Sequence, residues 1–404
     1  VRAESKSFIF YWFNIANIAN KYYIRVIYIS FMQRISYKYK IYKQNRNHQK
    51  RLDSLMHIAA EVYNHALALH KRYYRFFHKS LSKNALQKHI AKIKSRCYNH
   101  WNLLNSQAIQ QITDRIYSGY DRFFAHDAKH PPKFRSGRKY RSVTFKNSGW
   151  TLNGNVFTVN ALHLRLKFHC SRPIEGRVKT VCLSRDAVGD WWLSFSVEKE
   201  ESKMPKKPMS GKTAGFDFGL KHFLTGADEQ KIDSPLYLTH AIGQLKRKSR
   251  NLSRKVKGSR SRVRARRDLA RLYRRISCMR GDFHWKLALR LVEEYDVICL
   301  ETLHMNAMKR LWGRKVSDLG FAEFVNILSY QCSKHGKKLV RISQWEATSK
   351  TCSVCGYKEE SMPLKIRQWT CPSCGKTHDR DVNAAQNILR VGTSTLGRGN
   401  VRLA

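Results

Sequence analysis

Two closely spaced cysteine pairs near the carboxyl end constrain the fold of this chain more than any other feature. Fifteen residues separate the two pairs, which are Cys352/Cys355 and Cys371/Cys374. Two Cys-x2-Cys pairs at such a separation are typical of a structural zinc site with four thiolate ligands. Gly356 and Gly375 follow the pairs, where glycine can adopt a positive φ and let backbone N–H groups point at the sulfurs. The spacing therefore predicts a zinc ribbon over residues 347–377.

The charge of the chain indicates a polyanionic partner. Its 404 residues include 77 Lys and Arg but only 29 Asp and Glu, which gives a formal net charge of +48. Such an excess disfavours a compact state unless a polyanion neutralises part of it. The basic residues are spread along the whole chain, which favours a long nucleic acid over an anionic membrane surface. A hydrophobic content of 42% still predicts a folded chain, and its length predicts more than one module.

Three acidic residues stand where a carboxylate is costly unless it is paired or binds a metal. Asp217 lies within an apolar run, Glu301 ends another, and Asp381 follows the cysteine ribbon at the start of a predicted helix. Each also has a structural interpretation, as a turn former, a salt-bridge partner and a helix cap respectively. Together they suggest a carboxylate site for Mg²⁺, which prefers a few carboxylates, water and phosphate oxygens. One or two such ions would serve phosphodiester hydrolysis.

Two neighbours of Asp381 compete for a role at this site. Asp379 lies two residues before Asp381, on a different face of the start of the helix. His378 has the chemistry of a ligand or an acid–base group, but beside a ribbon it is more often structural or a phosphate contact. The sequence leaves both alternatives open.

The amino-terminal half reads as a β-barrel with a helical insert. Alternating residues predict a strand at 33–43, helical spacing follows over 47–129, and short strands follow over 143–198. Residues 32–46 and 130–201 are assigned to the barrel, and 202–211 to a linker rich in Pro and Lys.

The carboxyl-terminal half reads as an α/β unit over 212–346 and 378–392, followed by a tail at 393–404. It is predicted to contain a strand at 214–225, a helical stretch at 241–275 broken at Gly258, and a second helix at 283–295. Buried strands are predicted at 296–301 and 339–342.

The helical stretch 241–275 is almost purely basic. Like charges one helical turn apart are destabilising when nothing neutralises them, so a hairpin that follows a phosphate backbone is favoured over a solvated surface. The predicted contacts are Lys246, Arg247, Arg254, Lys255, Arg262, Arg266, Arg267 and Arg274.

The motifs resemble those of the TnpB (OrfB) family of insertion-sequence proteins, relatives of type V CRISPR effector nucleases. The matching segments are Gly215–Lys221, Asp296–Leu303, Ser349–Gly356, Trp369–Gly375 and His378–Ala385. The resemblance covers about Met32 to Leu389. It implies a RuvC-type nuclease domain of RNase H fold with the zinc ribbon inserted before its last acid, and an amino-terminal β-barrel with a helical recognition insert.

The resemblance also implies an activity. Asp217, Glu301 and Asp381 would be the three RuvC acids, and a guide RNA from the element's own transcript would direct cleavage of target DNA beside a short protein-read motif. That motif would be read in the amino-terminal half, by Tyr73, Tyr74, Lys133, Arg135 and Arg138. A separate transposase is a further candidate partner. Two alternatives stay open: a transposase that acts on DNA without a guide, and a non-catalytic RNA-guided DNA-binding regulator.

Residues 1–31 have no counterpart in the family and are interpreted as an upstream extension outside the fold. Although rich in Ile, Phe and Tyr, this segment is interrupted by Asn14, Lys21 and Arg25, which disfavours a membrane anchor. The expected location is the cytoplasm, at the nucleoid when bound to DNA.

Overall fold

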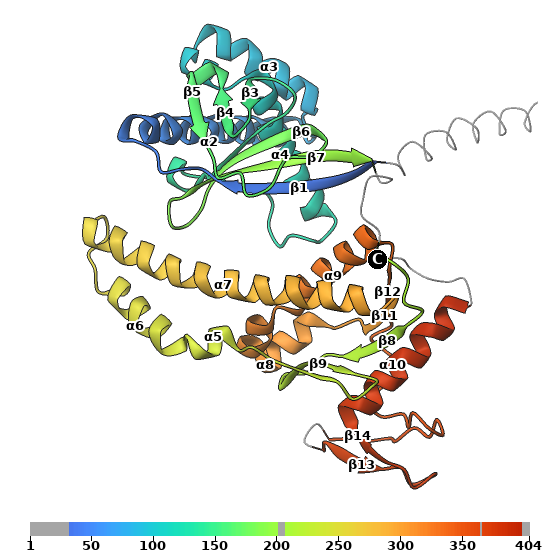
Figure 1. The fold of residues 1–404 in the computed structure, drawn as a ribbon. Coiled ribbons are helices and arrows are strands. Elements are labelled where there is room, and N and C mark those ends of the chain that lie inside the picture. The colour runs from blue at the N-terminus through green and yellow to red at the C-terminus, as the bar shows by residue number, and fades with distance from the viewer. Residues whose placement is uncertain (1–31, 201–206, 364–365, 398–404) are drawn as a thin grey trace, which may run out of the picture. The chain divides into compact units, whose positions relative to one another are not determined.

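The computed structural model describes residues 32–200, 207–363 and 366–397. The chain divides into two compact units, Val1–Lys203 and Met204–Ala404 (Figure 1). The predicted extension 1–31 lies outside the described residues, as do parts of the predicted linker and tail. In the part of the chain that is described, no helix has the length and apolar character that crossing a membrane requires.

The strands of the first unit form two antiparallel sheets. The four-stranded sheet has the order β1-β7-β6-β2, and the three-stranded sheet has the order β3-β4-β5. Their bounds are β1 Met32–Lys40, β2 Ser142–Phe145, β3 Trp150–Asn153, β4 Val156–Val159, β5 Leu164–Lys167, β6 Arg177–Arg185 and β7 Trp191–Glu200. A backbone bridge between Ile41 and Phe168 joins the sheets. The early strand is confirmed, since β1 pairs along its length with β7, whereas a closed barrel is not confirmed among the described residues.

Helices fill the segment between β1 and β2, as the helical spacing predicts. They are α2 Arg46–Phe77, α3 Lys83–Arg96, the short 3-10 helix η1 Asn99–Leu103 and α4 Ser106–Phe124. The side chains of Asn45, Ser82 and Asn105 cap the amino ends of the three α-helices by accepting backbone N–H groups. Leu52 of α2 and Ile112 of α4 share one buried core with strand residues such as Phe195. The helical segment and the sheets are therefore packed as one body.

The second unit is built on a five-stranded sheet of order β10-β9-β8-β11-β12. Its strands are β8 Thr213–Asp217, β9 His222–Gly226, β10 Lys231–Asp233, β11 Val297–Glu301 and β12 Lys338–Ile342. β8, β11 and β12 are parallel, and β9 and β10 form an antiparallel edge. The prediction of one strand over 214–225 is wrong, because the chain reverses at residues 218–221 and returns as β9.

Helices lie against both faces of this sheet (Figure 1). Their bounds are α5 Tyr237–His240, α6 Ile242–Ser253, α7 Arg260–Glu294, α8 Met305–Leu319, α9 Phe321–His335 and α10 Arg380–Gly397. Ile298 and Leu300 point into a core with α7 and α9, while Cys299 between them packs with Ile388 of α10. This alternation along β11 places α10 on the face opposite α7 and α9.

The basic stretch forms a helical hairpin. α6 and α7 enclose a small core of Leu245, Leu272 and Ile276, and they are separated at Gly258 as predicted. The second helix predicted at 283–295 is wrong as a separate element, because α7 continues without a break from Arg260 to Glu294.

The cysteine ribbon precedes α10 directly. Its two short strands, β13 Gln368–Thr370 and β14 Thr377–Asp379, pair antiparallel, and α10 begins at the next residue. The ribbon therefore leads into the helix that covers one face of the sheet.

Candidate active site and metal centre

The four cysteine sulfurs converge as the spacing predicts. All four Sγ atoms lie within 4.8 Å of one another, with 3.7 Å between Cys352 and Cys374 and 3.6 Å between Cys355 and Cys371. Four thiolates at about 2.3 Å from a tetrahedral zinc ion would have sulfurs about 3.8 Å apart. The donor set and its spacing fit a zinc ion.

Backbone turns hold the sulfurs in place. Gly356 and Gly375 have φ of +79° and +69°, and each donates its N–H to the carbonyl of the first cysteine of its pair. The N–H of Tyr357 donates to Cys355 and lowers the pKa of that thiol to about 6. The N–H of Lys376 makes the corresponding contact with Cys374 and lowers its pKa, but burial and the three neighbouring thiols outweigh that contact and raise the pKa of Cys374 to about 12. Thiolates are the metal-binding form of cysteine, so the two backbone N–H contacts favour metal binding.

His378 belongs to the ribbon and not to the acidic site. Its Nε2 lies 3.1 Å from Cys352 Sγ, and its ring packs 5.1 Å from that of Trp369. Burial lowers the pKa of His378, which favours the neutral imidazole. The contact places His378 beside Cys352 of the four-cysteine cluster.

Two asparagines tie the ribbon to α10. Asn383 Nδ2 donates to the carbonyl of Thr351 at 2.8 Å, and Asn387 Nδ2 donates to the same carbonyl at 2.6 Å. Asn383 Oδ1 accepts the backbone N–H of Ser353 at 2.8 Å. Asn383 and Asn387 are almost fully buried, so the first turns of α10 are fixed to the backbone around Cys352.

The three predicted acids come from two strand ends and one helix start. Asp217 ends β8 and Glu301 ends β11, and the register of these parallel strands pairs Leu300 with Phe216. The two carboxylates therefore leave neighbouring strands at the same edge of the sheet. Asp381 lies in the first turn of α10, which crosses β8 closely at Gly215.

The pKa of Asp217 depends on both of the other predicted acids. Burial raises the pKa of Asp217 well above its usual range, and the charges of Glu301 and Asp381 raise it further. The guanidinium of Arg380 acts in the opposite direction. Burial also raises the pKa of Glu301. A partly buried carboxylate with two like neighbours is costly unless a cation neutralises it, so the donor set fits Mg²⁺.

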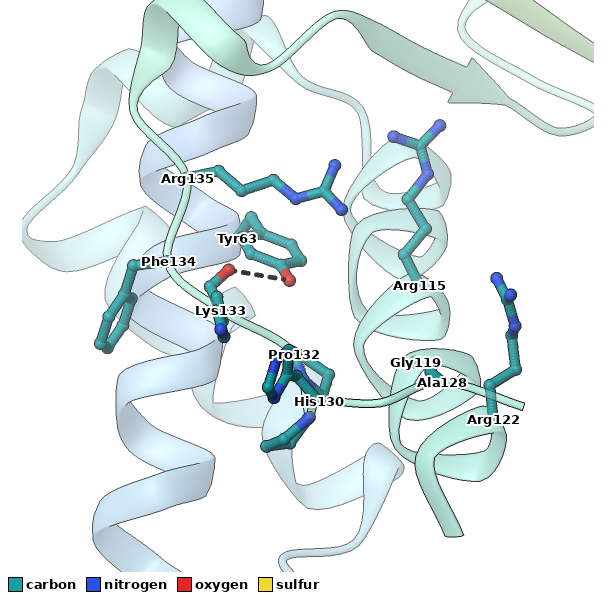
Figure 2. Close-up of a pocket in the computed structure, with 11 residues that line it drawn as sticks. Tyr63, Arg115, Gly119, Arg122, Ala128, His130, Pro132, Lys133, Phe134 and Arg135 are labelled. Atoms are coloured by element: carbon teal, nitrogen blue, oxygen red, sulfur yellow. Dashed lines mark hydrogen bonds between the residues drawn. The ribbon is translucent and has the colours of Figure 1, made fainter. Parts of the chain in front are cut away.

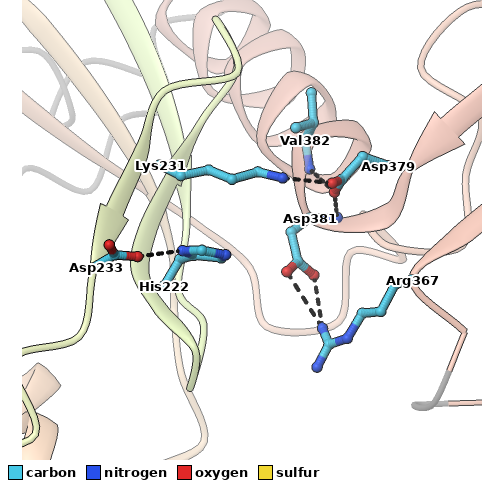
Figure 3. A network of polar contacts seen from close by, with 7 residues as sticks. All are labelled: His222, Lys231, Asp233, Arg367, Asp379, Asp381 and Val382. Carbon is cyan, nitrogen blue, oxygen red and sulfur yellow. Dashed lines mark hydrogen bonds and ion pairs between the residues drawn. The ribbon is translucent and has the colours of Figure 1, made fainter.

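The carboxylate oxygens do not form a closed ligand cage. Among the described residues, only the four cysteines form a group of three or more potential ligands whose donor atoms all lie within 4.8 Å of one another. The two carboxylate oxygens of Asp381 instead accept the same nitrogen, Arg367 Nη1 just before β13, at 3.3 and 3.4 Å (Figure 3). A guanidinium there partly neutralises the acid, and no sequence signal distinguishes Arg367 from the many other basic residues.

Asp379 has a different role from Asp381. Its Oδ1 accepts the backbone N–H groups of Asp381 and Val382, and its Oδ2 accepts Lys231 of β10 at 2.7 Å (Figure 3). Partial burial would raise its pKa, but these hydrogen bonds outweigh burial and lower it. Asp379 is therefore the cap of α10 and links it to the edge of the sheet, and Lys231 is a supporting residue that the sequence did not reveal.

The residues of the helical hairpin that are predicted to contact phosphates differ in exposure and in hydrogen bonding. Arg262 donates to the carbonyls of Leu252 at 3.0 Å and Lys255 at 2.7 Å, so its guanidinium caps the end of α6. Arg274 and Lys255 are half-buried. The exposed members are Lys246, Arg247, Arg254, Arg266 and Arg267.

A basic cavity of about 420 Å³ lies in the first unit, between α2, α4 and the segment 128–135 (Figure 2). Lys133 and Arg135 line it with Arg122 and Arg115, and none of the described residues that line it is acidic. Arg115 donates to the carbonyl of Ser142, while Arg135 lies over the ring of Tyr63.

The other residues predicted to read DNA in this unit are dispersed. Tyr74 and Arg138 are exposed, and Tyr73 packs against Phe77 with ring centroids 4.7 Å apart.

Comparisons with known proteins match both the sheet unit and the ribbon. A family model described as "Probable transposase" matches residues 194–311, and one described as "Cas12f1-like, TNB domain" matches residues 321–388. A "Putative RNA-guided DNA endonuclease" of Streptomyces pristinaespiralis is 35% identical over 302 residues, which cover 74% of each chain. "TnpB-like protein L79" of Acanthamoeba polyphaga mimivirus is 29% identical, and the match covers 56% of this chain but only 46% of that protein.

A solved structure supports the fold. The Cas12f1 chain of a complex with sgRNA and target DNA matches with a TM-score of 0.54 at 16% identity. The match covers 85% of this chain and 83% of that chain.

Proposed function

This chain belongs to the TnpB (OrfB) family of insertion-sequence proteins, and on that basis we propose that it is a transposon-encoded RNA-guided DNA endonuclease. The observation that carries the proposal is the meeting of Asp217, Glu301 and Asp381 at one edge of the sheet, where like charges and burial raise the pKa of Asp217. Carboxylates arranged at this cost are typical of a catalytic site.

The three acids would hold one or two Mg²⁺ ions. Bound there, Mg²⁺ supplies an activated water and stabilises the leaving 3′-oxygen of the cut strand. Asp217 and Glu301 offer their carboxylates from fixed strand ends. Asp381 offers its carboxylate from α10, whose position depends on Asp379 and on the ribbon. Arg367, which now contacts Asp381, would be available to a phosphate once a cation takes its place.

The four cysteines would hold a structural zinc ion. A zinc ion there would fix the backbone around Cys352, to which Asn383 and Asn387 attach α10. The ribbon thus supports the position of Asp381 without taking part in the chemistry.

The nucleic acids would bind along the basic surfaces. The exposed cations of the α6–α7 hairpin suit the phosphate backbone of a guide RNA and its DNA partner. The cavity beside Lys133 and Arg135 suits the DNA that flanks the target. These assignments follow the charge and the family, one member of which is described as a putative RNA-guided DNA endonuclease.

The proposal is tested by expressing the gene from Met32 with its native downstream DNA and sequencing the RNA that purifies with the protein. We expect a discrete RNA from the element's end, and cleavage of DNA matching its tail when Mg²⁺ is present. Asp217→Ala should abolish cleavage and retain the RNA. Heterogeneous RNA together with unguided DNA cutting or joining would contradict the proposal.

A further inference from the structure

A tryptophan lies at the same edge of the sheet as the acids. β12 ends at Ile342, next to Glu301 at the end of β11, and the N–H of Thr302 donates to the carbonyl of Ile342 at 3.1 Å. Trp345 follows three residues after Ile342. Because parallel neighbouring strands end at the same edge, the turn that carries Trp345 leaves the sheet beside Glu301.

Trp345 is 85% exposed, the highest value among the exposed large hydrophobic side chains of the described residues. Its turn is nonetheless fixed. Ser343 accepts the N–H of Trp345 on its hydroxyl and that of Glu346 on its carbonyl, each at 3.3 Å. Asn387 of α10 then holds the carbonyl of Thr348 at 2.9 Å. The indole is thus presented to solvent from an anchored turn and is not needed for the core.

The indole also lines a cavity with one of the acids. Glu301 and Trp345 face the same space of about 300 Å³, together with Leu303, His304, Met308 and Gln344. A carboxylate, two apolar side chains and a flat aromatic ring therefore surround one hollow beside the end of β11. This lining suits a group that is planar and apolar on its faces and polar at its edges.

We propose that Trp345 is a stacking platform for one unstacked nucleobase of the DNA strand that enters the acidic site. The proposal rests on the proposed nuclease function, because that function places a DNA strand beside Glu301. A nucleobase is the occupant that fits, since the chain's net charge of +48 favours a nucleic acid and an indole stacks on the face of any base. A base held there would fix the position of the adjoining phosphate relative to Glu301.

Photo-crosslinking tests the contact directly. The full chain with its co-purified RNA is mixed, in Ca²⁺, with single-stranded oligothymidylate carrying 5-iodouracil, irradiated, and digested for peptide mapping. We expect a crosslink at Trp345. Crosslinks that fall only on other residues, or no crosslink in a preparation that binds the oligonucleotide, would overturn the proposal.

Substitutions measure the energetic contribution of the ring. Trp345→Ala should weaken binding of the oligothymidylate about tenfold, as the loss of one stacked base does, whereas Trp345→Phe should keep most of the affinity. Trp285→Ala, a half-exposed tryptophan on α7 outside this cavity, should leave affinity unchanged. An abasic nucleotide at the crosslinked position should weaken the wild type but add nothing to Trp345→Ala. Unchanged affinity in Trp345→Ala would contradict the proposal.

The nuclease function and the stacking role of Trp345 can be contradicted independently of one another. A crosslink at Trp345 in a preparation without guided cleavage would remove the nuclease function and leave the base-binding role. Guided cleavage without this crosslink, and without an effect of Trp345→Ala, would remove the stacking role alone.

Discussion

Asp217 is the residue at which folding and function oppose one another most clearly. Burial and the charges of Glu301 and Asp381 raise its pKa, so the ionised form is held in the folded state at a cost. In the proposed catalytic role Asp217 would have to be ionised despite that cost, because the cation it would bind needs a negative site. A neutral side chain of the same shape at position 217 should therefore make the folded protein more stable but unable to cleave DNA.

We expect Asp217→Asn to raise the melting temperature in Mg²⁺-free buffer at neutral pH. The folded-state pKa is raised, so the carboxyl's contribution to stability is lost as pH rises from the ordinary value of 3.8 through the raised value. The advantage of the variant should grow over that range and shrink when Mg²⁺ is added. Thermal unfolding of both proteins across pH measures this, and a wild type that is as stable as the variant throughout would contradict it.

The pKa of Asp296 is shifted in the opposite direction to that of Asp217. It accepts Lys337 Nζ and the N–H groups of Ser210 and Gly211 at the start of β11, which lower its pKa to about 2. Both side chains of the ion pair are almost fully buried. Asp296→Asn should lower the melting temperature by several degrees at neutral pH, because it leaves Lys337 without its charge partner.

The pH dependence of that loss follows from the direction of the shift. A lowered pKa contributes stability that is present above the ordinary value of 3.8 and is lost as pH falls toward 2. The difference between wild type and Asp296→Asn should therefore shrink over this acid range in thermal unfolding. A difference that stays constant would show that the ion pair is not its source.

The sequence indicated Asp217, Glu301 and Asp381 as the candidate acids, with Asp379 as a competitor for the role of Asp381. Both lie in the same short motif and have the same chemistry. What distinguishes them is which carboxylate the first N–H groups of α10 reach, and that depends on where the helix begins. Similarly, the sequence predicts Arg262 as a phosphate contact and does not reveal its hydrogen bonds to the carbonyls of Leu252 and Lys255.

At the scale of elements, α10 and β8 are in unusually close contact. A Cβ on Gly215 would lie 2.6 Å from the carbonyl oxygen of Ala385 and 2.6 Å from the N of Leu389. Both are backbone atoms and cannot move independently of the helix. Glycine is thus required where α10 crosses the strand that carries Asp217.

Gly215→Ala should displace α10 and with it Asp381. We expect a loss of about 1–3 kcal/mol of folding free energy, as for other overpacked sites, and a larger relative loss of cleavage. Gly281→Ala is the matched control, because Gly281 lies within α7 with open space around it and alanine favours the helix. Chemical denaturation and a cleavage assay on both variants test this, and equal behaviour of the two would contradict it.

The type of an element was predictable where a long segment showed regular hydrophobic spacing. The prediction failed where tertiary packing determined the structure. The hairpin between β8 and β9 was read as one strand because Phe218 and Leu220 in its turn are themselves apolar. α7 was divided near Gly281, although its packing against α9 keeps it continuous. Helices α8 and α9 were not predicted. Strand β3 was not predicted as a separate strand either, because its four residues carry too little pattern on their own and its pairing with β4 stabilises it.

For the whole molecule, the net charge of +48 favours a folded state with a bound polyanion. Affinity for DNA or RNA should fall by about a thousandfold between 50 and 200 mM salt, as expected for several phosphate contacts. Arg266→Ala, on the exposed side of α7, should reduce the logarithmic salt slope by about one. Filter binding across a salt series measures both, and a flat response would contradict a phosphate-based interface.

We propose that Asp217, Glu301 and Asp381 form the cutting site, while Asp379 caps α10. The most direct test compares guided DNA cleavage by the variants Asp217→Asn, Glu301→Gln, Asp381→Asn and Asp379→Asn, each checked for retained zinc and RNA. We expect no cleavage by the first three variants and slowed but measurable cleavage by Asp379→Asn. Cleavage by any of the first three, or its complete loss in Asp379→Asn with zinc and RNA retained, would contradict it.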